Sequence, residues 1–134
     1  MDRQPTEALI LTRSIVLQQG LGALLESLTG ITQVTALKEI PGSFAWIETH
    51  MPAIVLLDYR LTGVQTKSVL ASVQELSPNT RRVLLVDDVQ EVNWVPSYAD
   101  AVLIRGIPPQ AVATLLANLL SSKGEDHEHI DPIA

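Results

Sequence analysis

The feature that most constrains this 134-residue sequence is a short apolar run, residues 54–57, that ends on a carboxylate, Asp58. Pro52 precedes the run and Gly63 closes the turn after it. An apolar run between such breakers is typical of a strand buried on both faces, as in parallel sheets. Ligands of open α/β sheets bind at the carboxyl ends of the strands, so we expect Asp58 at the functional edge of the domain.

Four further apolar runs are spaced along the chain, and segments of helical periodicity separate them. The predicted strands cover residues 8–11, 33–37, 54–57, 83–86 and 101–104. Apolar residues recur every three or four positions from Val16 to Leu28, and the last helix is expected from about Gln110 to Leu120. Parallel strands need crossover connections, and these connections are helical. The pattern therefore predicts an α/β fold, a doubly wound five-stranded parallel sheet with helices on both faces.

The remaining connections are less regular. We predict a short helix containing Trp46, with Ser43 as its N-cap after a Pro-Gly break. A further helix has a buried stripe from Val69 to Leu76. Residues 88–98 are poorly periodic and contain a proline, which predicts a shortened fourth helix.

Length and composition indicate one soluble domain. A chain of 134 residues with 46% hydrophobic residues can bury one substantial core. We assign residues 1–122 to this domain and the polar residues 123–134 to a tail that we expect to be disordered. No apolar run approaches the roughly 18 to 20 residues that span a bilayer, and the net charge is −6, so neither membrane nor nucleic acid is an expected partner. The absence of cysteine is compatible with a reducing compartment, and we expect a cytoplasmic protein.

Residues 58–63, Asp-Tyr-Arg-Leu-Thr-Gly, resemble the phosphoacceptor loop of response-regulator receiver domains in two-component systems. The resemblance covers residues 8–120, and residues 9–11 with 20–26 are similar to the start of receivers that precede LuxR-type DNA-binding domains. It implies a flavodoxin-like fold and phosphorelay signal transduction, with Asp58 as the phosphoacceptor candidate. It also implies a protein partner, a sensor kinase or a downstream regulator.

Four positions depart from the receiver pattern. Receivers hold a divalent cation with an acidic pair after the first strand, and they grip the phosphoryl group with a hydroxyl after strand four and a lysine after strand five. Here Thr12 and Arg13 replace the acidic pair. Asp87 replaces the hydroxyl residue, and Arg105 replaces the lysine. A guanidinium group cannot be deprotonated, so Arg13 brings a fixed positive charge to the place of the cation.

These departures predict an atypical receiver, or pseudo-receiver. We expect an ionic network in place of metal and phosphate, formed by Arg13, Arg105, Asp58 and Asp87. No cofactor, metal ligand or catalytic residue is predicted, and Mg²⁺ would be required only if Asp58 is a working phosphoacceptor. The predicted function is therefore a signalling module that acts through protein-protein contacts and is not an enzyme.

Two alternatives stay open. The first is an authentic receiver that is phosphorylated on Asp58. The second belongs to another class, a small flavodoxin-like cofactor-binding protein or enzyme. It would need a phosphate-binding loop after the first strand, and residues 12–15 contain no glycine.

The last helix is apolar on more than one side. Its large apolar residues include Leu115, Leu116, Leu119 and Leu120. A terminal helix of such a sheet normally has one face in water, so the excess predicts a protein-protein contact, most simply a homodimer. The alternative is a solvent face formed by the small alanines of this helix.

Overall fold

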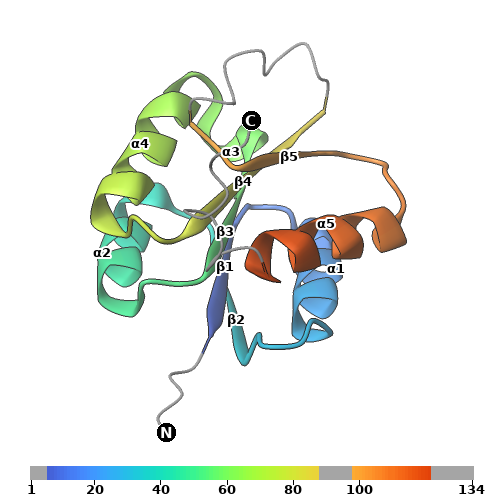
Figure 1. The fold of residues 1–134 in the computed structure, drawn as a ribbon. Coiled ribbons are helices and arrows are strands. Elements are labelled where there is room, and N and C mark those ends of the chain that lie inside the picture. Colours follow the sequence, from blue (N-terminus) through green and yellow to red (C-terminus); the bar gives the residue numbers. More distant parts are fainter. Residues whose placement is uncertain (1–5, 88–97, 122–134) are drawn as a thin grey trace, which may run out of the picture.

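The computed structural model describes residues 6–87 and 98–121, and their strands form one parallel sheet (Figure 1). Its order is β2-β1-β3-β4-β5, and all neighbouring pairs are parallel. The strands are β1 (Glu7–Leu11), β2 (Gln33–Leu37), β3 (Ile54–Asp58), β4 (Arg81–Val86) and β5 (Ala101–Ile104). The predicted five-stranded, doubly wound sheet is confirmed.

Two hydrophobic clusters lie on opposite faces of the sheet, because neighbouring residues of a strand point to opposite sides. In β3, Val55 and Leu57 belong to the cluster under α2 (Ile40–His50) and α4 (Thr66–Leu76). Ile54 and Leu56 belong to the cluster under α1 (Ile15–Glu26) and α5 (Pro109–Ser121). Figure 1 shows these helix pairs on the two sides of the sheet. Every residue of β3 is buried, as its continuous apolar run predicted.

The first turns of α1 and α2 are formed in different ways. The side chain of Ser14 caps α1, accepting a hydrogen bond of 3.1 Å from the backbone N–H of Leu17. The prediction of Ser43 as the N-cap of α2 is wrong. This helix begins at Ile40, and Ser43 lies inside it, fully buried, with its hydroxyl donating to the Ile40 carbonyl at 2.6 Å. The reason is that proline is tolerated in a first helical turn, where Pro41 lies.

The leucines of α5 contribute mainly to the core of the domain. Leu116 is 0% exposed, so its prediction as an interface residue is wrong. Leu115, Leu119 and Leu120 are half-buried and pack against the same cluster. The exposed positions of this helix include Ala111 and Ala117. The apolar excess of α5 is thus largely taken up by its own domain and by small side chains at the surface.

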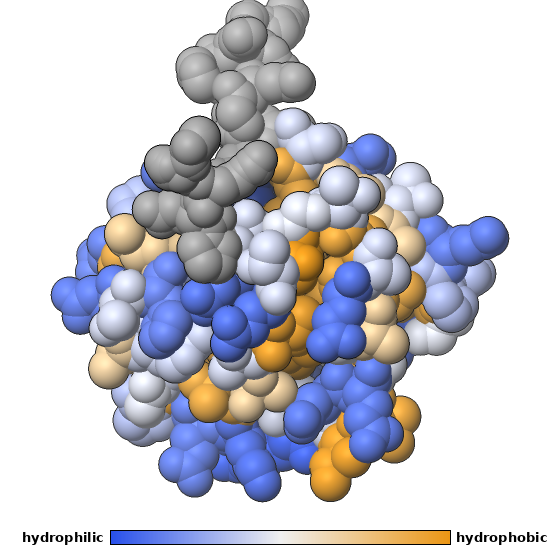
Figure 2. Space-filling view, turned by 90° about the horizontal axis from the view of Figure 1, so that it is seen from below, coloured by the Kyte–Doolittle hydropathy of each residue, from blue (hydrophilic) through white to orange (hydrophobic). Residues whose placement is uncertain are grey.

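Seen from below, the molecule carries a strip of hydrophobic residues between hydrophilic ones (Figure 2). No helix in the two described ranges is both long enough and apolar enough to cross a membrane. The predicted shortened helix in residues 88–98 and the predicted tail, residues 123–134, lie outside the described residues except for Tyr98.

Candidate functional site

Strand order and register bring Thr12 and Asp58 together. β1 pairs with β3, and Leu11 is the partner of Leu57, so the residues that follow both strands meet at the same level. The Thr12 hydroxyl donates to Oδ2 of Asp58 at 2.6 Å. Thr12 is 3% and Asp58 4% exposed. The two predicted site residues therefore form a buried contact at the carboxyl edge of the sheet.

Asp58 also begins a helix. It is the N-cap of α3 (Tyr59–Thr62), and its Oδ1 accepts a hydrogen bond of 3.0 Å from the backbone N–H of Arg60. The 3₁₀ helix η1 (Gly63–Gln65) follows. A capping carboxylate satisfies a helix N–H that would otherwise lack an acceptor. Capping is thus a structural role of Asp58 that the sequence analysis did not assign.

Arg105 connects Asp58 with Asp87. Val86 is the register partner of Ile104, so Asp87 and Arg105 leave adjacent strands side by side. Two nitrogens of the Arg105 guanidinium donate to the two acids, Nη2 to Oδ1 of Asp58 and Nε to Oδ1 of Asp87. The Arg105 side chain is only 19% exposed. Three of the four predicted network members are therefore in contact.

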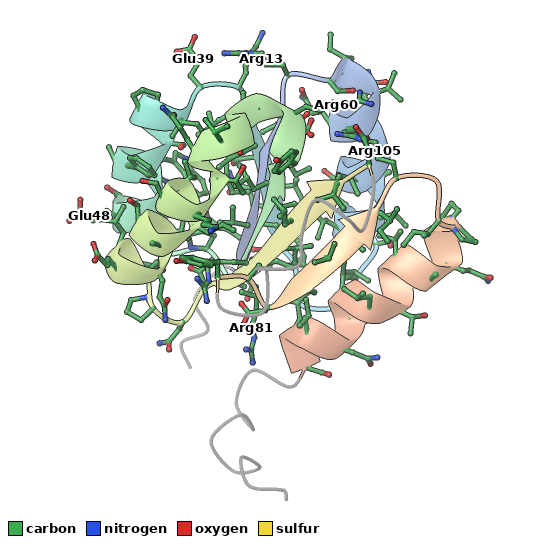
Figure 3. All side chains as sticks on the ribbon, turned by 90° about the horizontal axis from the view of Figure 1, so that it is seen from above. Arg13, Glu39, Glu48, Arg60, Arg81 and Arg105 are labelled. Carbon is green, nitrogen blue, oxygen red and sulfur yellow. The ribbon has the colours of Figure 1, made fainter. Side chains whose placement is uncertain are left out.

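The fourth member of the network is Arg60, where the sequence analysis had placed Arg13. Arg60 binds Asp87 with two hydrogen bonds, from Nε at 3.1 Å and from Nη2 at 3.2 Å. Arg13 is exposed and forms no ion pair with any described residue. In Figure 3 it lies at the rim near Glu39, apart from Arg60 and Arg105. The expectation that Arg13 belongs to the ionic network is therefore wrong.

A small hollow of about 250 Å³ lies over this edge. Asp58, Arg13, Ser14 and Arg60 line it together with Leu61. Arg13 thus borders the site without holding either carboxylate. The sequence signal for Arg60 was its position two residues after Asp58, within the turn that Asp58 caps.

The electrostatic environment lowers the pKa of Asp87 below its ordinary value of 3.8. The main cause is the hydrogen bonding from Arg60, and the hydrogen bond and charge of Arg105 act in the same direction. Removal of the carboxylate from water opposes them. Asp87 therefore stays ionised at any pH above its ordinary range, and it keeps both guanidinium groups at the site.

The divalent cation that the receiver resemblance implies does not fit these donors. Mg²⁺ takes oxygen ligands, mainly carboxylates, carbonyls and water. At this edge Thr12 supplies a hydroxyl in place of an acid, and the carboxylates of Asp58 and Asp87 are both bound by guanidinium groups. Within residues 6–87 and 98–121, no group of three or more His, Cys, Asp or Glu could hold a metal ion. At this edge the negative charges of the carboxylates are compensated by guanidinium groups, as in a salt-bridge network.

Solved structures of receiver domains have a similar fold. A CheY-like receiver from Methanospirillum hungatei aligns with a TM-score of 0.76 at 17% identity, over 92% of this chain and 99% of its own. The signal receiver domain of an HD domain-containing protein from Pseudomonas fluorescens aligns at 0.78 and 19% identity, over 96% of both chains. A LuxR family DNA-binding response regulator from Silicibacter pomeroyi aligns at 0.73 and 18%, over 87% and 93%.

No protein-family model and no curated protein matches the sequence. The likeness is therefore one of structure, and it extends over nearly all of the chain. The domain has the flavodoxin-like fold of response-regulator receiver domains, as the resemblance of residues 58–63 predicted.

Proposed function

We propose that this chain is a receiver-like signalling module that acts through protein-protein contacts, without Mg²⁺-dependent phosphorylation of Asp58. The observation that carries the proposal is the state of the Asp58 carboxylate. Oδ2 accepts from Thr12, and Oδ1 accepts from the Arg60 backbone and from Arg105. Three of the roughly four lone-pair sites of this carboxylate therefore accept hydrogen bonds from the protein, which weakens it as a nucleophile toward phosphorus.

Charge balance supports the same proposal. Phosphoryl transfer depends on cations that neutralise the phosphoryl oxygens as charge develops on them. The guanidinium group of Arg105 is already shared between Asp58 and Asp87, and Arg60 is bound to Asp87. An incoming phosphoryl group would also meet the negative charge of Asp87, where receivers carry a hydroxyl. Removing the metal from a reaction of this type forfeits several kcal/mol of charge stabilisation.

The partner in this proposal is another protein, either a sensor kinase or a downstream regulator. No reaction on a small molecule is proposed, because the Thr12 hydroxyl, which contacts the Asp58 carboxylate at this edge, is only 3% exposed. A homodimer through α5 would rest on Leu115, Leu119 and Leu120, which are half-buried in their own domain. This interface stays a prediction, and the core position of Leu116 reduces the apolar area that it could bury.

The proposal is tested by titrating the ¹⁵N-labelled protein with Mg²⁺ and beryllofluoride and following backbone amides by NMR. We expect no saturable shift of the amides of Thr12, Asp58 and Arg60 at millimolar Mg²⁺. Acetyl phosphate labelling followed by mass spectrometry, with Asp58→Asn as the control, provides a second readout. Labelling that disappears in Asp58→Asn would contradict the proposal and identify an authentic phosphoacceptor.

A further inference from the structure

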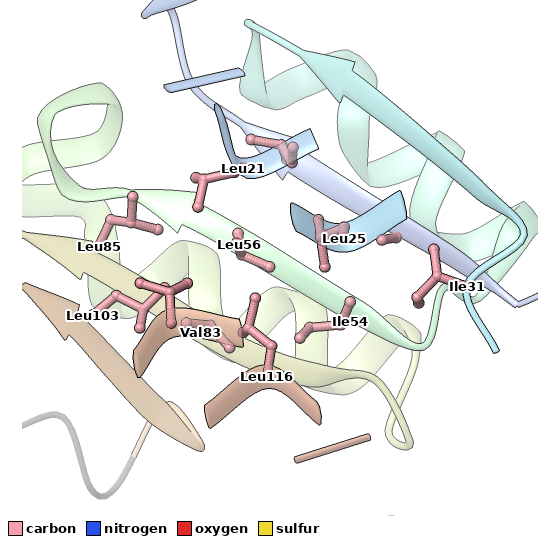
Figure 4. Packing of buried hydrophobic residues seen from close by; sticks show 12 residues of the cluster. Leu21, Leu25, Ile31, Ile54, Leu56, Val83, Leu85, Leu103 and Leu116 are labelled. Carbon is pink, nitrogen blue, oxygen red and sulfur yellow. The ribbon is translucent and has the colours of Figure 1, made fainter. Parts of the chain in front are cut away.

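An apolar hollow of about 380 Å³ lies between α1 and α5, beside the site described above. Its walls come from four parts of the fold, with Leu21 on α1, Leu85 on β4, Leu103 on β5 and Val112 on α5. Figure 4 shows Leu21, Leu85 and Leu103 on this side of the sheet. The volume falls within the range of sites that bind small molecules, and such sites are mostly apolar with a few polar groups.

A glycine in the middle of α1 keeps this hollow open. Gly20 lines it, and a Cβ built at this position would meet no heavy atom within 4 Å. Glycine inside a helix is less stable than alanine, and packing does not require it here. Val16, one turn before Gly20, is 79% exposed and stands on the rim of the hollow. Solvent therefore has access to the apolar walls along this side of α1.

Arg105 is the charged residue that lines the hollow. Its Nε and Nη2 donate to Asp87 and Asp58, while its remaining nitrogen, Nη1, donates to no described residue. A guanidinium nitrogen with N–H groups to spare favours an acceptor, and a carboxylate is the strongest acceptor for it. One charged residue, Arg105, thus lines the apolar hollow and also belongs to the ionic network at the carboxyl edge of the sheet.

We propose that the hollow binds a small, mostly apolar carboxylic acid, with its ring or short chain against the leucines and its carboxylate on Arg105. The bound carboxylate competes with Asp58 and Asp87 for the same guanidinium group. Ligand binding in the hollow therefore changes the ion pairs of Arg105 at the carboxyl edge of the sheet. This inference does not depend on the proposed absence of phosphorylation, because it concerns a different cavity and a different ligand.

The test uses 2-naphthoate as the probe and the ¹⁵N-labelled full chain. We expect saturable shifts of the amides of Gly20 and Gly106, both of which line the hollow. Gly20→Leu fills the hollow and should weaken binding about tenfold or more, which corresponds to roughly 1.4 kcal/mol. Gly22→Leu is the matched control, since Gly22 lies on the same helix, has equally open space, and does not line this hollow. Its affinity for 2-naphthoate should stay unchanged.

The neutral analogue 2-naphthalenemethanol tests the role of Arg105. It should bind about tenfold more weakly than 2-naphthoate, because it lacks the charge-assisted hydrogen bond. Equal affinity of the two compounds, or equal affinity of the two glycine variants for 2-naphthoate, would overturn the proposal. So would the absence of saturable shifts at millimolar 2-naphthoate. Sedimentation velocity completes the test, since dissociation of a dimer in Gly20→Leu alone would assign the hollow to a second copy of the chain and exclude the ligand.

Discussion

Asp58 is the last residue of β3, and Asp87 directly follows the neighbouring strand β4. Both bind the guanidinium group of Arg105, but they differ in their exposure to solvent. The Asp58 side chain is 5% exposed, and its partners include a hydroxyl and a backbone N–H as well as Arg105. The Asp87 side chain is 42% exposed, and it is held by two guanidinium groups, one of which, on Arg60, is itself 64% exposed.

The difference in exposure indicates that Asp58 has a structural role, whereas the ion pairs of Asp87 can be exchanged. Hydrogen bonds to a buried carboxylate are strong and little affected by salt, and their loss leaves polar groups without partners. Ion pairs at the surface are weakened by water and by salt. Asp58 therefore stabilises the carboxyl edge of the sheet, whereas Asp87 can exchange its partners at small cost.

The strongest test of this comparison is Asp58→Ala. The substitution removes the acceptor of the Thr12 hydroxyl and of Nη2 of Arg105, whose Nε still donates to Asp87, and it removes the cap of α3. Breaking a buried pair on one side destabilises proteins by about 3 to 5 kcal/mol, and we expect a loss of this size in urea denaturation at neutral pH. Asp58→Asn should lose less, because its amide oxygen still accepts a hydrogen bond. Unchanged or increased stability of Asp58→Ala would show that the carboxylate is retained for chemistry alone.

A smaller effect is expected for Thr12→Val, which keeps the shape and removes the hydroxyl. Oδ2 of Asp58 then loses its donor, and the backbone N–H of Ser14 loses its acceptor, a bond of 3.0 Å. A buried polar group without a partner costs about 1 to 3 kcal/mol, so the free energy of unfolding should fall by this amount. Thr12→Ser, which restores the hydroxyl, serves as the control. If both variants unfold at the same urea concentration, the hydroxyl does not support Asp58.

The smallest effect is expected for Asp87→Asn, and it should depend on pH and salt. Folding lowers the pKa of Asp87, so its ion pairs stabilise the folded state above the ordinary value of 3.8 and lose this contribution as the pH falls through the lowered pKa. The stability difference between wild type and variant should be constant near neutral pH and disappear in acid. Added salt should reduce it further. A difference that persists in acid or in high salt would place Asp87 in the same class as Asp58.

The strands were the most predictable part of the fold. β2 and β5 have the predicted bounds, because both are short runs that lie between turn signals. The start of α2 was missed because Pro41 both interrupts helices and begins them, and local sequence does not distinguish the two uses. The role of Leu116 was missed because periodicity shows that a helix is apolar without showing how much of it its own domain covers.

The candidate site was predictable in its positions and less so in its contacts. Strand ends determine which residues converge, and Thr12, Asp58 and Arg105 meet as expected. The choice between Arg13 and Arg60 as a network member depends on the direction of long side chains after the strands end, which strand register does not determine. The turn capped by Asp58 directs Arg60 to Asp87 and leaves Arg13 at the rim.

The contact between Thr12 and Asp58 also bears on how this site could evolve. Substituting an acid for Thr12 alone would place two carboxylates within hydrogen-bond distance in a buried position, where like charges repel strongly. Arg60 and Arg105 would still occupy the remaining space around the carboxylates. Metal binding at this edge would therefore require several linked substitutions. The network therefore resists conversion into a metal site by any single substitution.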